Sequence, residues 1–254
     1  MIKILFTAAT SWELRVLKQE IKKLTLKNIR VDFLLIWIWN YSTIYNLSST
    51  IDKQKYNFIV NIWVCGYSEI CQKFIQIGRI KNLSNNKELI VPSFIKMWNL
   101  ESIASSEKII YLSDEIWEEN FVDMESYGVE FVSSQYEIPR IILKVPVDKI
   151  WEETKKFDFE KAKKLLWENI DYKLLLDKIS EYIEKNKTYK TDNVFLKKYH
   201  NHYKMSFAEK AIFEKLFNKY SVLIEDEWWE NFEDFFEKNK ELNKKEFFRK
   251  LEQV

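Results

Sequence analysis

The hydrophobic positions of the first 150 residues form short apolar runs separated by amphipathic segments. Continuously apolar runs of this length are typical of buried parallel strands. The runs are Lys3–Thr7, Phe33–Trp39, Phe58–Val64, Glu88–Pro92, Lys108–Leu112 and Ile141–Val147. Between them, apolar residues recur at helical spacing, first over 12–23 with Ser11 as the predicted cap and then over 40–52. Strands that alternate with helices predict an α/β domain with a mainly parallel sheet flanked by helices.

The strand pattern stops after Asp148, and only helical signals follow. Asp158 and Asp171 each precede a segment with helical spacing, and residues 185–203 are polar enough to form a linker. Three further helices are predicted, of which the first begins with a capping box at Ser206 and Glu209. We therefore expect an α/β domain over residues 1–185, followed by a linker and an all-helical C-terminal appendage over residues 186–254.

Composition narrows the classes of partner. Lys and Arg total 40 against 39 Asp and Glu, so charge gives no argument for nucleic acid or an anionic membrane surface. No run reaches the ~18 apolar residues that a membrane span needs. Cys65 and Cys71 are too few for a disulfide framework and are expected to be reduced, buried thiols in a cytoplasmic protein. His200 and His202 have no nearby metal-ligand pattern and are expected to be exposed to solvent.

The stretch from Phe121 to Asp148 carries the clearest candidate chemistry. A helix is expected to open with Asp123, Met124 and Glu125, and a strand beyond Pro139 ends just before Asp148. A carboxylate at a helix start and one just past a strand end converge at the rim of an open α/β sheet where ligands bind. Glu13, just after the first strand's turn, is a third acid near that rim. Each acid alone also suits a helix start or a turn, so it is their combination that favours a site.

The run from Asp123 to Asp148 resembles the signature of the purine nucleoside phosphorylase and nucleosidase superfamily. That signature is a Met-Glu pair on a helix followed, about twenty residues later, by a strand ending in Ser-Asp or similar. The branch it looks most like is the methylthioadenosine/S-adenosylhomocysteine nucleosidases, with futalosine hydrolase next. The resemblance extends patchily over residues 1–185 and implies a nucleoside phosphorylase-like fold.

The resemblance also implies roles for individual residues. Asp148 would protonate the purine leaving group, and Glu13 would act as general base on water. Glu125 would accept hydrogen bonds from the ribose hydroxyls, and Met124 would pack on the sugar face. Gly66 is the glycine that remains from a substrate-binding loop, while Ser113 and Trp117 stand where the base would stack. Neither a metal nor an organic cofactor is implied; a small nucleoside is the expected partner, and a homodimer is one assembly that the family allows.

Departures from the family pattern bear on the reaction. The loops that are normally rich in glycine read Trp39-Asn40-Tyr41 and Trp63-Val64-Cys65-Gly66 here, and bulky residues hinder the approach of a backbone to phosphate. Hydrolysis of the N-glycosidic bond of a purine or 5′-substituted purine nucleoside is therefore the favoured function. Phosphorolysis of the same bond is one alternative. A non-catalytic nucleoside-binding or protein-interaction module, using the aromatic pairs of the appendage, is another, and a pocket filled by Trp63 or Tyr41 would favour it.

Overall fold

The computed structural model describes residues 1–69, 74–111, 113–116, 118–150, 158–168, 170–187, 199–206, 209–210, 212–213 and 228–252. The chain divides into two compact units, Met1–Ile183 and Glu184–Val254. Each unit is described by itself below.

The larger unit is built on an eight-stranded sheet. Its strands are β1 (Ile2–Ala8), β2 (Ile29–Leu35), β3 (Phe58–Tyr67), β4 (Ile75–Asn82), β5 (Glu88–Ile90), β6 (Leu100–Ser105), β7 (Phe121–Asp123) and β8 (Arg140–Lys149). The order is β2-β1-β3-β7-β6-β4-β5, and β8 pairs with both β3 and β4. The pairings from β3 through β7, β6, β4 and β8 therefore close into a ring.

The sheet is mixed, so the expectation of a mainly parallel sheet holds only in part. β1 pairs parallel with β2 and β3, and β3 pairs parallel with β8. β4, however, runs antiparallel to both β5 and β8, and β3 runs antiparallel to β7. The apolar runs predicted the strands of one parallel part, β2-β1-β3-β8. The strands of a second parallel part, β4-β6-β7, were not predicted.

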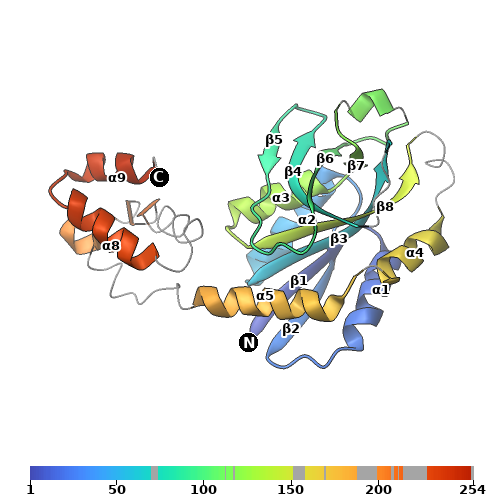
Figure 1. Ribbon diagram of the computed structural model, residues 1–254, viewed down its shortest axis with the longest axis horizontal. Helices are drawn as coiled ribbons and strands as arrows, with labels where there is room; N and C mark the ends of the chain where they lie inside the picture. The colour runs from blue at the N-terminus through green and yellow to red at the C-terminus, as the bar shows by residue number, and fades with distance from the viewer. Residues whose placement is uncertain are drawn as a thin grey trace. The chain divides into compact units, whose positions relative to one another are not determined.

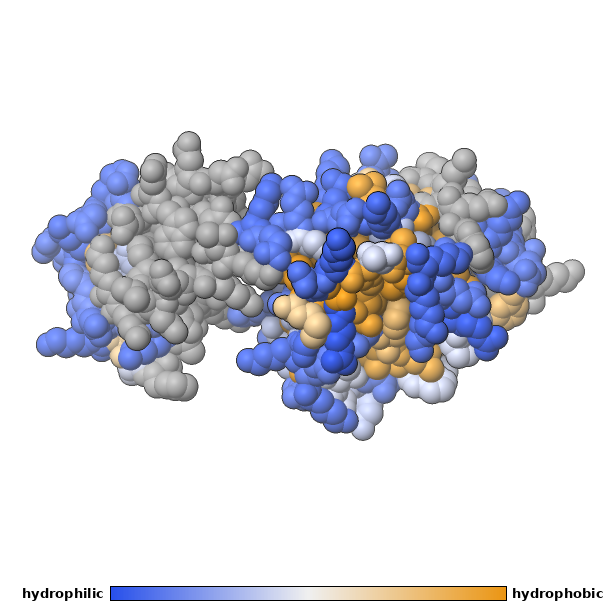
Figure 2. Space-filling model, turned by 90° about the horizontal axis from the view of Figure 1, so that it is seen from below, coloured by the Kyte–Doolittle hydropathy of each residue, from blue (hydrophilic) through white to orange (hydrophobic). Residues whose placement is uncertain are grey.

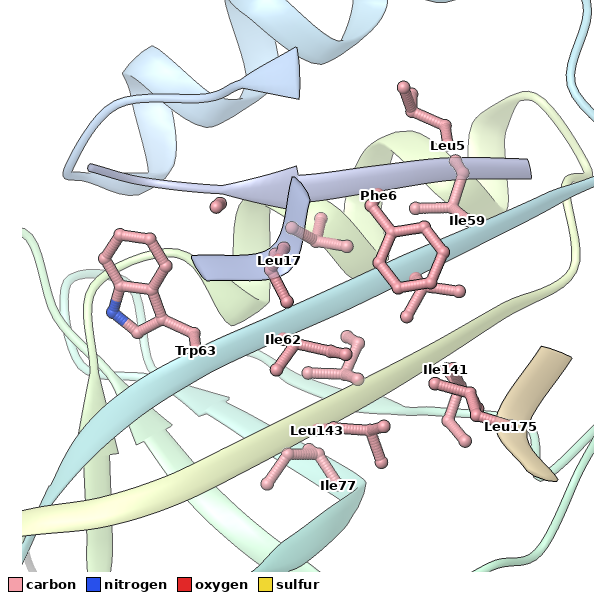
Figure 3. Close-up of a cluster of buried hydrophobic side chains, with 14 of the residues drawn as sticks. Leu5, Phe6, Leu17, Ile59, Ile62, Trp63, Ile77, Ile141, Leu143 and Leu175 are labelled. Carbon is pink, nitrogen blue, oxygen red and sulfur yellow. The ribbon is translucent and has the colours of Figure 1, made fainter. Parts of the chain in front are cut away.

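Helices cover both faces of this sheet. They are α1 (Ser11–Lys22), α2 (Asn40–Lys53), α3 (Ser126–Gln135), α4 (Phe159–Glu168) and α5 (Tyr172–Lys187), with a 3-10 turn η1 at Ser113–Ile116. Figure 1 shows α4 and α5 in front of the sheet and α3 behind it. The core combines many aliphatic side chains with aromatic ones such as Phe6 and Trp63. Figure 3 shows side chains of β1, β3 and β8 packed with Leu17 of α1 and Leu175 of α5.

Helix α3 packs unusually close to α2 because of Gly128. A Cβ at this position would lie 2.7 Å from the Asn40 carbonyl oxygen and 2.9 Å from Thr43. The Gly128 N–H also donates a hydrogen bond to Asn40 Oδ1 at 2.9 Å. The two helices are thus held at a separation that only glycine allows, which fixes where the N-terminus of α3 stands.

Three predicted boundaries were wrong. Of the apolar run 108–112, the described residues 108–111 form no strand, and Ile109 is 52% exposed. Strand β2 ends at Leu35, and the exposed residues Trp37 and Trp39 follow with φ of 63° and 79°. The helix expected at Asp123 begins at Ser126, because Phe121–Asp123 pairs as β7 and Glu125 occupies the N-cap.

In the smaller unit, the described residues are mostly helical. They include α8 (Trp228–Asn239) and α9 (Lys244–Glu252), and the predicted capping box between Ser206 and Glu209 is present. Aromatic rings form the core of this unit, among them Tyr199, Phe213, Phe236 and Phe247. His202 is exposed as expected, but the expectation for His200 was wrong, because its ring is buried against Phe213.

The edge strand β2 remains half-buried along most of its length. It lies on the lower side of the larger unit in Figure 1, and Figure 2 shows that this side carries an apolar stretch between hydrophilic side chains. Asp32 on this strand binds Arg30 at 2.9 Å and Gln54 at 2.7 Å.

No helix in the described part of the chain is long and apolar enough to span a bilayer.

Candidate active site

One pocket of about 410 Å³ opens at the rim formed by the C-terminal ends of β1, β3 and β8. Its size suits a small ligand, since such sites usually measure ~300–1,000 Å³. The lining comes from segments far apart in the sequence: the start of α1, the second half of β3, the loop after β6, the β7–α3 junction and the end of β8. The pocket brings together Glu13, Glu125 and Asp148, the three acids that the sequence singled out.

Glu13 is held at the start of α1 by Thr10. The Thr10 hydroxyl donates a hydrogen bond of 2.7 Å to Glu13 Oε2, and the Thr10 N–H donates another of 3.3 Å. The other oxygen, Oε1, is buried and has no hydrogen-bond partner of good geometry among the described residues. Burial raises the pKa of Glu13 to about 8, against the opposing effects of the Thr10 hydrogen bonds and the Lys144 charge. Glu13 can therefore exchange a proton close to neutral pH.

Glu125 stands at the N-cap of α3 and is fully buried. Its pKa is raised well above the usual value, first by burial and then by the neighbouring Asp123 charge. Glu13 raises it further, whereas Lys144 lowers it. Burial thus shifts Glu125 towards its neutral form, and a neutral carboxyl group both donates and accepts hydrogen bonds.

Asp148 reaches the pocket from the end of β8, beside Gly66 of β3. The β3–β8 register shifts between Cys65 and Gly66, so that Gly66 pairs with Asp148, and Gly66 also pairs with Val122 of β7. A Cβ on Gly66 would come within 3.2 Å of the Val122 side chain and 3.4 Å of Ile150. The missing side chain thus allows β7 and β8 to close around β3 at the pocket wall.

The role of Asp123 was not predicted from the sequence: it pairs with Lys144, in the middle of β8. Their side chains are fully buried and form an ion pair, with Lys144 Nζ 2.6 Å from Asp123 Oδ2. Asp123 lines the pocket. The available signal was a lysine in the middle of an otherwise apolar strand, since a buried lysine requires an acidic partner.

The remaining predicted site residues have different outcomes. Met124 and Gly66 line the pocket. Trp117 and the side chain of Ser113 lie outside the described residues, so their expected contact with a base stays a prediction. Trp63 forms part of the wall without filling the cavity, and Tyr41 is 73% exposed. Among the described residues, no cluster of three or more His, Cys, Asp or Glu side chains is arranged to hold a metal ion.

Apolar side chains also line the pocket. Trp12 and Phe159 meet edge to face with ring centroids 5.6 Å apart, and Ile38, Ile109 and Ile110 are further lining residues. The pocket therefore offers a ligand both carboxyl groups and apolar surface. A ligand that carries a polar sugar beside a larger apolar group would match this combination.

No family model and no curated protein matches this sequence. Solved structures share its fold. The MTA-bound nucleosidase (MTAN) of Chlamydia trachomatis is 20% identical, covers 70% of this chain and 100% of its own, and has a TM-score of 0.56. The 5′-methylthioadenosine/S-adenosylhomocysteine nucleosidase of Campylobacter jejuni is 16% identical (73% and 100% covered, TM-score 0.57). A futalosine hydrolase mutant of Helicobacter pylori is 12% identical (65% and 97% covered, TM-score 0.56). The likeness of fold that the Asp123–Asp148 run predicted is confirmed.

Proposed function

We propose that this protein hydrolyses the N-glycosidic bond of a purine nucleoside or a 5′-substituted purine nucleoside. The observation that carries the proposal is the convergence of Glu13, Glu125 and Asp148 on one nucleoside-sized pocket. The fold shared with nucleosidases supports the same reaction, including one solved with MTA bound. Neither a metal nor an organic cofactor is part of the proposed chemistry.

The proposed reaction divides the work among the three acids. Cleavage of a glycosidic bond passes through an oxocarbenium-like transition state, in which one acid protonates the leaving group and another carboxylate activates the nucleophile. Asp148 gives its proton to N7 of the purine. Glu13 takes a proton from the attacking water, for which its pKa of about 8 is well placed. Glu125 binds the ribose hydroxyls, and Met124 packs on the sugar.

Water is favoured over phosphate because the pocket offers little to hold a dianion. Phosphate sites use free backbone N–H groups together with arginine or lysine. Here the bulky Trp63 and Val64 precede Gly66 on β3, and none of the described residues that line the pocket is an arginine. The two lysines close to the acids are engaged elsewhere: Lys144 pairs with Asp123, and the exposed Lys108 pairs with Glu115.

A non-catalytic role has less support. Neither of the two bulky residues fills the cavity: Trp63 lines its wall, and Tyr41 is exposed to solvent. The described aromatic residues of the smaller unit pack into its own core, among them Phe236 and Phe247. These rings are therefore not a surface on which a base or a partner could stack.

The first test is the nucleophile. We expect purine release from methylthioadenosine or a related nucleoside in phosphate-free buffer, with the free sugar as product and no more than a twofold change on adding millimolar phosphate. Chromatography of the base and the sugar from a panel of purine nucleosides measures this. Release that requires phosphate and yields a sugar 1-phosphate would replace hydrolysis by phosphorolysis. If no nucleoside releases its base, the non-catalytic binding or interaction module would be the favoured function instead.

We also propose that residues 186–254 form a separable helical extension of the catalytic domain. The described residues that line the pocket all lie between Thr10 and Phe159, within the larger unit. A chain ending at Lys187 keeps α5 whole and should stay soluble, unfold cooperatively and release purine at the full-length rate. Yield, thermal unfolding and turnover measure this. Insoluble protein would instead assign the extension to the core or to a homodimer interface.

A further inference from the structure

A buried ion pair lies at the wall of the pocket, which its acidic member, Asp123, helps to line. Lys144 lies in the middle of β8, between Trp63 of β3 and Ile75 of β4, and its side chain is completely buried. Its ammonium group contacts Asp123 Oδ2 at 2.6 Å but makes no hydrogen bond of good geometry to a described residue. Burying an ammonium group costs several kcal/mol. Asp123 offsets that cost by its opposite charge.

Asp123 connects this pair to the start of α3. It accepts a hydrogen bond from the Ser126 N–H at 3.0 Å and another from the Ser126 hydroxyl at 2.5 Å. Ser126 is the first residue of α3 and directly follows Glu125. Lys144 therefore holds Asp123, and Asp123 holds the turn that presents Glu125 to the pocket.

The charge of Lys144 also acts on both glutamates of the pocket. Acids face it from three elements: Asp123 from β7, Glu125 from the start of α3 and Glu13 from the start of α1. Lys144 lowers the pKa of both Glu13 and Glu125, whereas Asp123 raises that of Glu125. The other charged residues that line the pocket are Asp148, from β8, and Lys108, from the loop after β6.

We propose that Lys144 is a positioning residue: through Asp123 it fixes Glu125 at the pocket, and its charge balances the acids that face the substrate. This inference rests on the proposed nucleosidase function for its effect on turnover. The geometry of the pair and its electrostatic effect on Glu13 do not depend on that function.

Two substitutions should have opposite effects on the pH at which the pocket glutamates ionise. Lys144→Met removes the positive charge, so the ionisation midpoints should rise by about one pH unit or more. Asp123→Asn removes a negative charge and leaves Lys144 in place, so the midpoint of Glu125 should fall. Asparagine still accepts the Ser126 N–H, as a good capping residue does, so α3 should keep its start. Lys87→Met, at an exposed loop position, controls for the loss of one lysine.

The measurement that does not depend on turnover is infrared absorption of protonated carboxyl groups between pH 5 and 10, with Glu13→Gln and Glu125→Gln assigning the bands. Turnover is measured in parallel, and Lys144→Met should lower kcat/KM by about 10²-fold and move its ascending limb to higher pH. Opposite shifts of the midpoints support the proposal even if no nucleoside is cleaved, in which case only the proposed function fails. If the wild-type protein hydrolyses nucleosides but the midpoints are unshifted in both variants, the proposal for Lys144 is overturned and the proposed function stands. If Lys144→Met does not fold, Asp123→Asn alone decides.

Discussion

Replacing Asp148 with asparagine should lower the rate of purine release by about 10²–10⁴-fold, the usual cost of losing a general acid. The side chain stands at the end of β8 beside Gly66, on the pocket wall. Asparagine fills the same space and can still form a hydrogen bond to N7 of a purine, but it has no acidic proton to give. The loss should therefore appear in kcat, while adenine binding changes little.

Steady-state kinetics with a purine nucleoside and calorimetric binding of adenine separate the two effects. Asp177→Asn, at an exposed position of α5, is the matched control. Turnover equal to that of the wild-type protein would exclude Asp148 as the proton donor. Loss of adenine binding together with turnover would instead assign Asp148 to binding.

Replacing Glu13 with glutamine should lower the activity and raise the stability of the protein at alkaline pH. In the proposed reaction Glu13 is the general base, so kcat/KM should again fall by about 10²–10⁴-fold. In the wild-type protein, the ascending limb of log kcat/KM against pH should have its midpoint near 8, because Glu13 must be ionised to accept a proton and its pKa is about 8. This limb should be absent from the residual activity of the variant.

The second effect of Glu13→Gln is a gain in stability at alkaline pH. The pKa of Glu13 is raised from 4.5 to about 8 in the folded protein, so the folded state holds this proton more tightly than the unfolded state. Stability from this group is complete below pH 4.5 and is lost as pH rises to about 8. Glutamine stays neutral and can still accept the Thr10 hydrogen bonds. The variant should be about as stable as wild type at pH 4.5 and about 3–5 kcal/mol more stable at pH 9.

Urea unfolding at the two pH values measures the difference. Glu160→Gln is the matched control, because Glu160 also lies in the first turn of a helix, α4, but is exposed. It should show no comparable gain. Equal stability of wild type and Glu13→Gln at pH 9 would mean that Glu13 is ionised without penalty, and that its proton transfer is not tuned by burial.

The hydrophobic pattern predicted the parallel centre of the sheet well and failed beside the pocket. The run 108–112 is apolar, yet Ile109 and Ile110 line the pocket and do not pair in the sheet. The run from Phe33 continues past the end of β2 for the same reason, since Ile38 lies on the pocket wall. A ligand pocket and a sheet interior both require apolar side chains, so periodicity alone cannot separate them.

The convergence of the three acids on one pocket was predicted from their order along the chain, but the electrostatics around them was not. Glu13 and Glu125 stand at helix starts and Asp148 near the end of β8, and such positions converge in an α/β fold. The pairing of Lys144 with Asp123 depends instead on β7, a three-residue strand that ends at Asp123, where the sequence predicted the start of a helix. The antiparallel pairings of β4 depend on contacts between distant segments, which local patterns do not encode.

The glycines of this chain offer a way to search other glycine-poor sequences for sites. Only three are present, and at each of them an added methyl group would come within 3.2 Å of a neighbouring atom. Two of them serve the pocket: Gly66 lets β7 and β8 close on its wall, and Gly128 seats the helix that begins beside Glu125. In a sequence with so few glycines, each remaining glycine indicates a position where neighbouring segments pack too closely for a side chain. In this protein, two of the three glycines identify the region of the pocket without reference to any charged residue.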